Sequence, residues 1–275
     1  MCSFRKKIFL RAFTLFAGIT LMCASAHAVL DMEEDYLPAK PEGMPDLDAS
    51  TAFMSKYIWR GQNLVDAPVM QFDVNLSKYG FTLDLWGNYS MSRDKANGSY
   101  QELTELDYTA SYEFSVGEMM GYMGVEDAEA LDPWSISMGY TFYTFPNMDL
   151  DEKGATSHEV FVGTSYDILL QPFFTWYWDV EAGHGSYLQF GGGHTFDLGN
   201  DITADIGAAF GYNYEQWTDK HGWSDMLLSL DVTIPFFNHF YLVPNVSYSV
   251  ILDRDTYNDA QENEFFGGVT LGFSY

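Results

Sequence analysis

The stretch that decides the fold reads FTLDLWGNYSM and runs from Phe81 to Met91. A period of two places its side chains on opposite faces, since a helix would instead bury every third or fourth residue. The stretch therefore predicts a β-strand with one apolar and one more polar face. The apolar face carries Phe81, Leu83, Leu85, Tyr89 and Met91, and the other carries Thr82, Asp84, Trp86, Asn88 and Ser90.

The same alternation recurs along the chain from Ala49 onward. Most of the alternating segments are longer than a typical soluble strand and match the roughly 9–11 residues that a tilted strand needs to cross hydrocarbon. No helical pattern intervenes, so the segments are expected to pair as antiparallel neighbours. There are twelve of them, at 50–63, 67–78, 80–91, 101–115, 133–145, 156–167, 171–182, 185–197, 201–214, 222–234, 238–252 and 262–275.

A soluble sandwich would show the same alternation, because it turns its apolar faces inward. Three features favour a barrel in lipid: the length of the segments, the aromatic residues near the strand ends, and the export that the N-terminus predicts, as described below. We therefore predict an all-β fold, a transmembrane antiparallel up-and-down β-barrel of about twelve strands over residues 49–275. The residues expected to form aromatic girdles are Trp134, Tyr140, Phe142, Phe145, Trp176, Trp178, Tyr187, Phe236, Phe237, Phe240 and Tyr241.

The connections support the same architecture. Several joins are tight turns, such as those at Lys78–Gly80 and Leu198–Asn200, and others are longer and polar, such as Glu215–His221. Short turns on one rim and long loops on the other are typical of outer-membrane barrels. The segment from Val116 to Asp132 is a long join on the short-turn rim.

The N-terminus predicts export. Residues 1–28 have a basic start, an apolar stretch and the Ala26-His27-Ala28 cleavage pattern of a signal peptide. A lipoprotein processed at Cys23 is the weaker alternative, because Met22 is large for that position. Residues 29–48 are rich in proline and acids, which predicts a flexible acidic segment.

Charge excludes other classes of protein. The 275 residues contain 13 Lys and Arg against 39 Asp and Glu, a net charge of -26, so nucleic-acid phosphates would be repelled. The single long apolar run lies at the N-terminus, which argues against a multi-span helical membrane protein. We expect neither a nucleic-acid partner nor a cofactor.

The sequence around the first strands resembles a known family. Residues 55–61, SKYIWRG, are similar to the Ser-x-Tyr-x-x-Arg-Gly motif of the TorF-type porin family, also known as Gcw_chp. Further matching stretches follow in the same order and together span about half of the chain, at 67–71, 80–88, 105–108, 140–146 and 159–163. The resemblance implies an outer-membrane barrel of bacteria and a pore, and it transfers no catalytic or binding residue.

If the apolar face meets lipid, the polar face lines a lumen. We expect Lys56 and Arg60, on the first strand, to pair across the interior with some of its carboxylates. A lumen and rim dominated by acids would favour cations. The predicted pore-lining residues are Lys56, Arg60, Asp73, Asp84, Glu105, Asp107, Asp179, Asp205 and Asp231.

Three functions are compatible with this pattern. The leading prediction is an outer-membrane porin of a Gram-negative cell that passes small solutes by passive diffusion. The second is a non-conducting structural or adhesive barrel, because twelve strands give a width between a filled eight-stranded barrel and a water-filled porin. The third is an outer-membrane hydrolase, for which the nearest candidate is His184-Gly185-Ser186 at a predicted turn.

We predict no catalytic residue and no metal site. The histidines of the exported chain lack close metal-ligand spacing. The loop acids are expected to form solvated loops, with divalent-cation binding beside lipopolysaccharide phosphates as the alternative. The expected partners are lipid, lipopolysaccharide, small solutes and the barrel-assembly machinery, which would recognise the C-terminal strand ending at Tyr275. These histidines are His158, His184, His194, His221 and His239, and the loop acids are Asp149, Asp151, Glu152, Asp253, Asp255 and Asp259.

Overall fold

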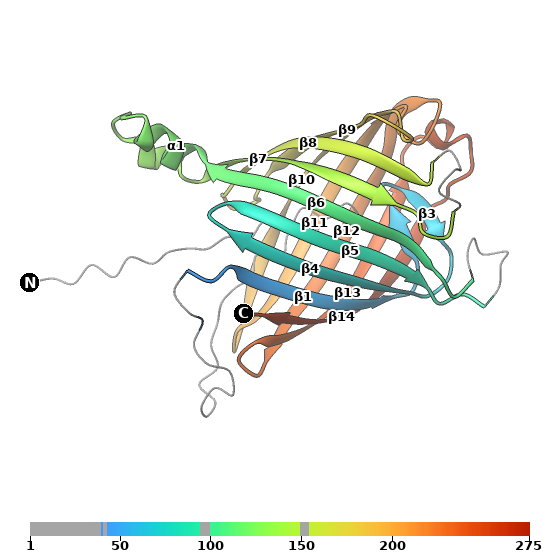
Figure 1. Cartoon of the computed structure of the whole chain (residues 1–275), viewed down its shortest axis with the longest axis horizontal. Helices are drawn as coiled ribbons and strands as arrows, with labels where there is room; N and C mark the ends of the chain where they lie inside the picture. The colour runs from blue at the N-terminus through green and yellow to red at the C-terminus, as the bar shows by residue number, and fades with distance from the viewer. Residues whose placement is uncertain (1–39, 41–42, 94–99, 149–153) are drawn as a thin grey trace, which may run out of the picture.

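The computed structural model describes residues 40, 43–93, 100–148 and 154–275. Twelve strands form one closed antiparallel barrel (Figure 1), so the predicted fold class is confirmed. These strands are β1 (Asp46–Met54), β4 (Val69–Lys78), β5 (Phe81–Ser90), β6 (Leu103–Ser115), β7 (Trp134–Thr144), β8 (Thr156–Tyr166), β9 (Phe173–Asp179), β10 (Gly185–Gly199), β11 (Ile202–Tyr214), β12 (His221–Phe236), β13 (Phe240–Ile251) and β14 (Glu264–Ser274).

The barrel closes where its first and last strands meet. β1 pairs with β14 on one side and with β4 on the other, with Asp48 opposite Ser274 and Phe53 opposite Val269. Leu47 and Tyr275 exchange backbone hydrogen bonds of 2.9 and 2.8 Å. Every barrel strand therefore has two neighbours, as a wall in hydrocarbon requires. The predicted signal peptide lies outside the described residues, and β1 begins at Asp46.

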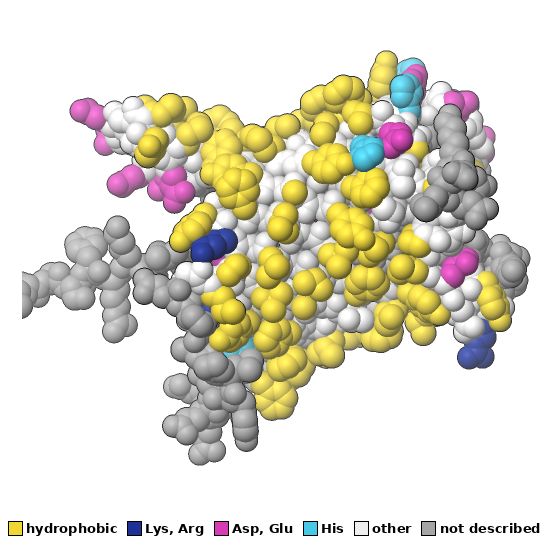
Figure 2. Space-filling view, in the orientation of Figure 1, with side chains coloured by type: hydrophobic (Ala, Val, Ile, Leu, Met, Phe, Trp, Pro, Cys, Tyr) yellow, Lys and Arg dark blue, Asp and Glu magenta, His cyan; other side chains and the backbone are white. Residues whose placement is uncertain are grey.

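The predicted orientation of the strands is the one observed. On β5, Phe81 and Leu83 are 64% and 61% exposed, whereas Trp86 and Asn88 on the opposite face are buried. Figure 2 shows apolar side chains spread over the outer wall between the two rims. The outward face is mostly apolar and the interior contains most of the polar side chains, which is the arrangement of a barrel that spans a membrane.

The first predicted strand is wrong in its second half. β1 ends at Met54, and the chain then leaves the wall to form a separate two-stranded sheet of β2 (Tyr57–Trp59) and β3 (Gln62–Val65). Arg60 and Gly61 form the turn between them, both with positive φ of 47° and 78°, as a two-residue hairpin turn requires. Lys56 and Arg60 therefore do not belong to a wall strand.

This lumenal hairpin, residues 57–65, is enclosed by the barrel. The ring of Tyr57 packs against Trp86 of β5 with centroids 5.5 Å apart, and Trp59 contacts Tyr143 of β7 edge-on at 6.3 Å. Ile58 packs with Leu227 of β12 and Phe266 of β14. Because these wall strands lie on different sides of the barrel, the hairpin bridges the lumen.

Two residues assigned to the aromatic girdles face the lumen instead. Tyr187 is fully buried, and its hydroxyl donates to Asp225 at 3.0 Å. The hydroxyl of Tyr241 donates to Asp48 at 2.8 Å. Both rings carry a hydroxyl that finds an acceptor among the interior acids, which explains their inward position.

The long join after β6 contains a short helix, α1 (Val116–Tyr122), and the 3-10 turn η2 (Ala128–Leu131). It projects beyond the rim at the end where β1 begins and β14 ends (Figure 1). A second 3-10 turn, η3 (Arg254–Tyr257), lies between β13 and β14. Among the described residues, no helix combines the length and apolar character needed to cross a bilayer.

The outward face of β12 provides a test of orientation. We expect Leu228→Lys, near the middle of the strand, to lower the free energy of unfolding by about 2–4 kcal/mol, because it places a charge in hydrocarbon. Tyr79→Lys, in the β4–β5 turn, is the control and should cost about 0–1 kcal/mol near the interface. Urea unfolding in lipid vesicles measures both, and equal costs would contradict the membrane orientation.

Candidate functional site

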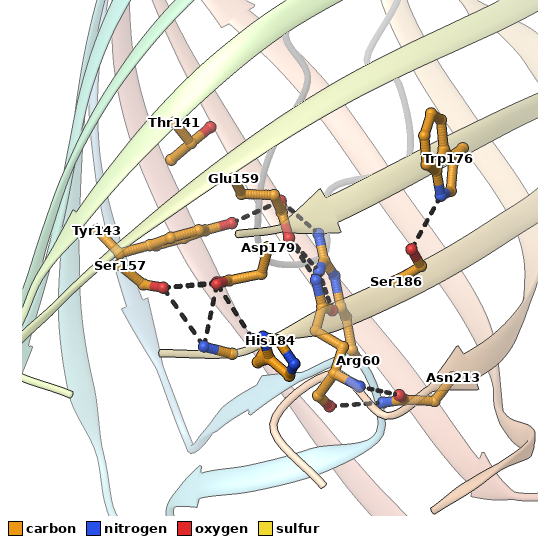
Figure 3. A network of polar contacts seen from close by, with 12 residues as sticks. Arg60, Thr141, Tyr143, Ser157, Glu159, Trp176, Asp179, His184, Ser186 and Asn213 are labelled. Atoms are coloured by element: carbon orange, nitrogen blue, oxygen red, sulfur yellow. Dashed lines mark hydrogen bonds and ion pairs between the residues drawn. The ribbon is translucent and has the colours of Figure 1, made fainter. Parts of the chain in front are cut away.

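Arg60 at the tip of the lumenal hairpin is the centre of a buried polar network (Figure 3). Its Nη1 and Nη2 donate to the two carboxylate oxygens of Glu159 on β8 at 2.7 and 2.9 Å. Gln216 accepts from Arg60 and donates to Glu159 at 2.6 Å. Glu159 and Gln216 are 0% exposed, so this bidentate pair is shielded from water.

Aromatic rings surround the same guanidinium. Its central carbon lies 4.5, 4.1 and 4.8 Å from the ring centroids of Trp59, Tyr177 and Tyr187. Cation–π attraction of this kind is strongest where the cation is desolvated. The Tyr143 hydroxyl donates to Glu159 at 2.9 Å. Arg60 therefore ties the hairpin to β7, β8, β9 and β10.

The turn of the hairpin also lies against β12. A Cβ added to Gly61 would come within 2.7 Å of the Asp225 Cβ, so only glycine fits this close approach. The Asp225 carboxylate accepts from Tyr187 at 3.0 Å and from Ser224 at 2.7 Å. The hydroxyl of Tyr257 in η3 donates to the Arg60 carbonyl, and burial raises the pKa of that phenol.

Lys56 lies at the base of the hairpin. Its Nζ is 2.7 Å from Asp66 and 2.6 Å from Glu264. The hydrogen bonds to Asp66 and then to Glu264 raise the pKa of Lys56, and the bond from Lys56 lowers the pKa of Asp66. The stability that Asp66 contributes is therefore lost as pH falls through its lowered pKa. The stability that Lys56 contributes is lost as pH rises through its raised pKa. Across neutral pH both hold the hairpin at the rim.

The other predicted acids occupy two parts of the wall. Asp73, Asp84, Glu105 and Asp107 lie on the neighbouring strands β4, β5 and β6 with their side chains toward the lumen. Asp205 and Asp231 lie directly opposite each other on β11 and β12. The structure thus places these acids on the lumen face, and their part in permeation stays a prediction.

Asp179 is engaged in a turn. Its carboxylate accepts from Ser157 Oγ at 2.7 Å and from the backbone N–H groups of Glu181 and Gly183, each at 3.0 Å. It is 0% exposed. These bonds fix the connection between β9 and β10, so its role here is structural.

The residues that hold Arg60 were not among the predicted lumen residues. The alternation of Ser157, Glu159 and Phe161 with His158 and Val160 was sufficient to place Glu159 inside. The same period places Tyr143 and Tyr177 inward. Gln216 lies in a loop, where no period exists to indicate its direction.

The hydrolase candidate is not assembled. Ser186 Oγ accepts from Trp176 Nε1 at 3.1 Å, and the backbone N–H of His184 donates to Asp179 at 3.3 Å. No hydrogen bond joins His184 to Ser186 in the described part of the chain. Among the described residues, no group of three or more His, Cys, Asp or Glu is arranged to hold a metal ion.

Two of the loop acids that the structure describes, Asp253 and Asp255, have protein partners. Asp253 accepts from the backbone N–H of Asp255 at 3.0 Å, and Asp255 pairs with Lys220. That hydrogen bond raises the pKa of Lys220. Asp149, Asp151 and Glu152 lie outside the described residues.

These features define a membrane-spanning β-barrel whose polar lumen contains a hairpin held by a buried ion pair. No protein-family model matches the chain, and no curated protein matches it either. The resemblance to the TorF-type family is therefore not confirmed and stays a prediction.

Solved structures similar to this chain include outer-membrane porins and channels, and also an outer membrane phospholipase A from Escherichia coli. The NanC porin is 12% identical, with a TM-score of 0.49 over 83% of this chain and 98% of its own. The KdgM porin in complex with disordered oligogalacturonate is 11% identical, with a TM-score of 0.49 over 84% and 99%. An outer membrane channel from Pseudomonas putida F1 is 11% identical, with a TM-score of 0.49 over 88% and 100%. At this similarity none carries a functional conclusion.

The buried ion pair provides a second test. We expect Glu159→Gln to lower the free energy of unfolding by about 3–5 kcal/mol, because it leaves the Arg60 charge buried and uncompensated. Arg60→Met combined with Glu159→Gln should cost less than the sum of the two single changes. Unfolding titrations measure the costs.

The control for that cycle is Lys220→Met, which breaks the more exposed pair with Asp255. It should leave stability nearly unchanged, because solvent screens an exposed ion pair. Additive costs for Arg60 and Glu159 would contradict the coupling described here.

Proposed function

We propose that this protein is an outer-membrane porin that passes small solutes by passive diffusion through a narrow lumen. The observation that supports it is the closed barrel with apolar residues outside and carboxylates and other polar side chains among the residues of its inner wall. A barrel that served only as an anchor would not need carboxylates facing its interior on β4, β5, β6, β11 and β12. Such side chains are stable there when water or a cation reaches them.

The lumenal hairpin limits what can pass. It contacts β5, β7, β8, β9, β10, β12 and β14, and its residues Tyr57, Ile58 and Trp59 are 3%, 2% and 6% exposed. Permeation with the hairpin in this position is restricted to small solutes. Displacement of the hairpin would widen the path.

A non-conducting structural barrel is the second candidate, and the same hairpin favours it. Its buried side chains fill the lumen across the width of the barrel, and the Arg60–Glu159 pair holds it in place. The two candidates differ in one measurable respect, since only the first gives conductance with the native hairpin.

The outer membrane of a Gram-negative cell is the proposed location, because closed β-barrels of this length with polar interiors are the spanning structures of that membrane. The exposed aromatic and aliphatic side chains of the wall suit acyl chains and lipopolysaccharide. The strand ending at Tyr275, which completes the closure with β1, is the proposed signal for barrel assembly.

Removing the hairpin tests the restriction. In planar bilayers, we expect the wild type to give small conductance steps and a variant with residues 57–65 replaced by a short Gly-Ser linker, together with Glu159→Gln, to give steps several-fold larger. Tyr79→Ala, at the opposite rim, is the control and should leave conductance unchanged. Different gel mobility of boiled and unboiled protein confirms folding. No steps from folded wild type would refute the porin and support the structural barrel.

Selectivity tests the role of the acids. In a potassium chloride gradient, the reversal potential of the wild type should indicate preference for potassium, because the described lumen acids outnumber the bases. Asp205→Asn with Asp231→Asn should move the reversal potential toward that of a non-selective pore. An anion preference in the wild type would contradict the proposal.

A further inference from the structure

The lumen contains two neighbouring sites in which a carboxylate lies among aromatic rings. In the first, the cation is supplied by the chain itself, since Arg60 binds Glu159 and lies within 5 Å of the centroids of three rings. In the second, Asp107 of β6 has the carboxylate and the rings but no protein cation. We call this second site the Asp107 cage.

The strand register places rings on both sides of Asp107. It lies directly opposite Trp86 of β5 and directly opposite Tyr143 of β7, and all three side chains face the lumen. Directly opposed residues on one face of a sheet have neighbouring side chains. Asp107, Trp86 and Tyr143 are 2%, 4% and 2% exposed.

The lumenal hairpin completes the cage from the other side. Tyr57 packs on Trp86 and Trp59 packs on Tyr143, with centroid distances of 5.5 and 6.3 Å. Trp59 also lies over Arg60, so one ring is shared between the two sites. The cage therefore consists of Asp107 with Tyr57, Trp59, Trp86 and Tyr143.

Neither carboxylate oxygen of Asp107 has a hydrogen-bond partner in the described part of the chain. Glu105 lies two residues away on the same face of β6 and adds a second negative group. The nearby bases are engaged, since Arg60 binds Glu159 and Lys56 binds Asp66 and Glu264. A buried carboxylate without a partner is costly, so a mobile cation would stabilise it.

We propose that the Asp107 cage binds a small protonated amine, with its ammonium charge on the Asp107 carboxylate and its remaining surface against the rings. Metal ions such as calcium and magnesium take six or more oxygen ligands, whereas the residues directly opposite Asp107 on both neighbouring strands, Trp86 and Tyr143, are aromatic. Aromatic cages favour organic ammonium ions through cation–π attraction. The site names a substrate class for the pore proposed above and rests on that function for its role in transport.

The binding and the hairpin are coupled in this arrangement. Two of the four rings, Tyr57 and Trp59, come from the hairpin, and the other two come from the wall. A bound ammonium ion would therefore contact both parts at once and stabilise the hairpin in its observed position.

Calorimetric titration of the folded full barrel in detergent with methylammonium chloride, at constant ionic strength, tests the site. We expect saturable binding by the wild type that sodium chloride competes with only weakly. Asp107→Asn should weaken the affinity at least about tenfold, which corresponds to about 1.4 kcal/mol. Asp231→Asn removes a lumen carboxylate on β12, away from the cage, and should leave the affinity within about threefold.

Four results would overturn the proposal: no binding by the wild type, equal binding by Asp107→Asn, an equal loss in Asp231→Asn, or equal competition by sodium. Heat-dependent gel mobility shows whether each variant is folded. If Asp107→Asn does not fold, Trp86→Leu keeps the carboxylate and removes a ring, and it should lower the affinity for methylammonium but not for sodium. Unchanged methylammonium affinity in that variant would also refute the cage.

Binding is measured without a membrane potential, which separates this proposal from the pore. If the barrel binds methylammonium but gives no conductance, the porin function is refuted and the amine-binding site is supported. A barrel that conducts potassium but does not bind methylammonium refutes the site and keeps the porin.

Discussion

The whole structure depends on one constraint, which is that hydrocarbon offers no partner for a backbone N–H or C=O group. A sheet in that environment has to close, and here β1 closes against β14 with Leu47 and Tyr275 bonded at the seam. In a closed sheet with alternating side chains, the direction of each side chain is then determined. Alternate residues meet lipid, and the polar remainder can face only inward.

The inward face contains many more acids than bases, and the chain pairs only some of these acids. Acids from β4, β5, β6, β8 and β12 are enclosed in a space with few bases. The lumenal hairpin brings Arg60 into this space and neutralises Glu159, and Tyr187 and Ser224 hydrogen-bond Asp225. Asp107 is left without such a partner. The hairpin therefore acts both as an obstruction and as a source of positive charge.

The wall strands could be predicted from the sequence, because a period of two determines which side chains face outward and which face inward. The segment 80–91, for example, contains β5 and faces the way its pattern indicated. Prediction failed where tertiary contacts override the period. Tyr57, Ile58 and Trp59 extend the first strand by composition, yet the chain leaves the wall after Met54 and reverses at the Arg60-Gly61 turn inside the lumen. Tyr187 was assigned to lipid because aromaticity alone does not distinguish a girdle from a buried hydrogen-bonding ring.

A lumen built in this way makes stability and permeation compete for the same carboxylates. A carboxylate bound by Arg60 or by a tyrosine rigidifies the hairpin and is removed from the set available to a passing cation. A carboxylate left free attracts cations but destabilises the barrel until one arrives. In the division observed here, Glu159 is bound by Arg60, whereas neither carboxylate oxygen of Asp107 has a hydrogen-bond partner among the described residues. A cation that enters therefore meets a site made by the same hairpin that restricts its passage.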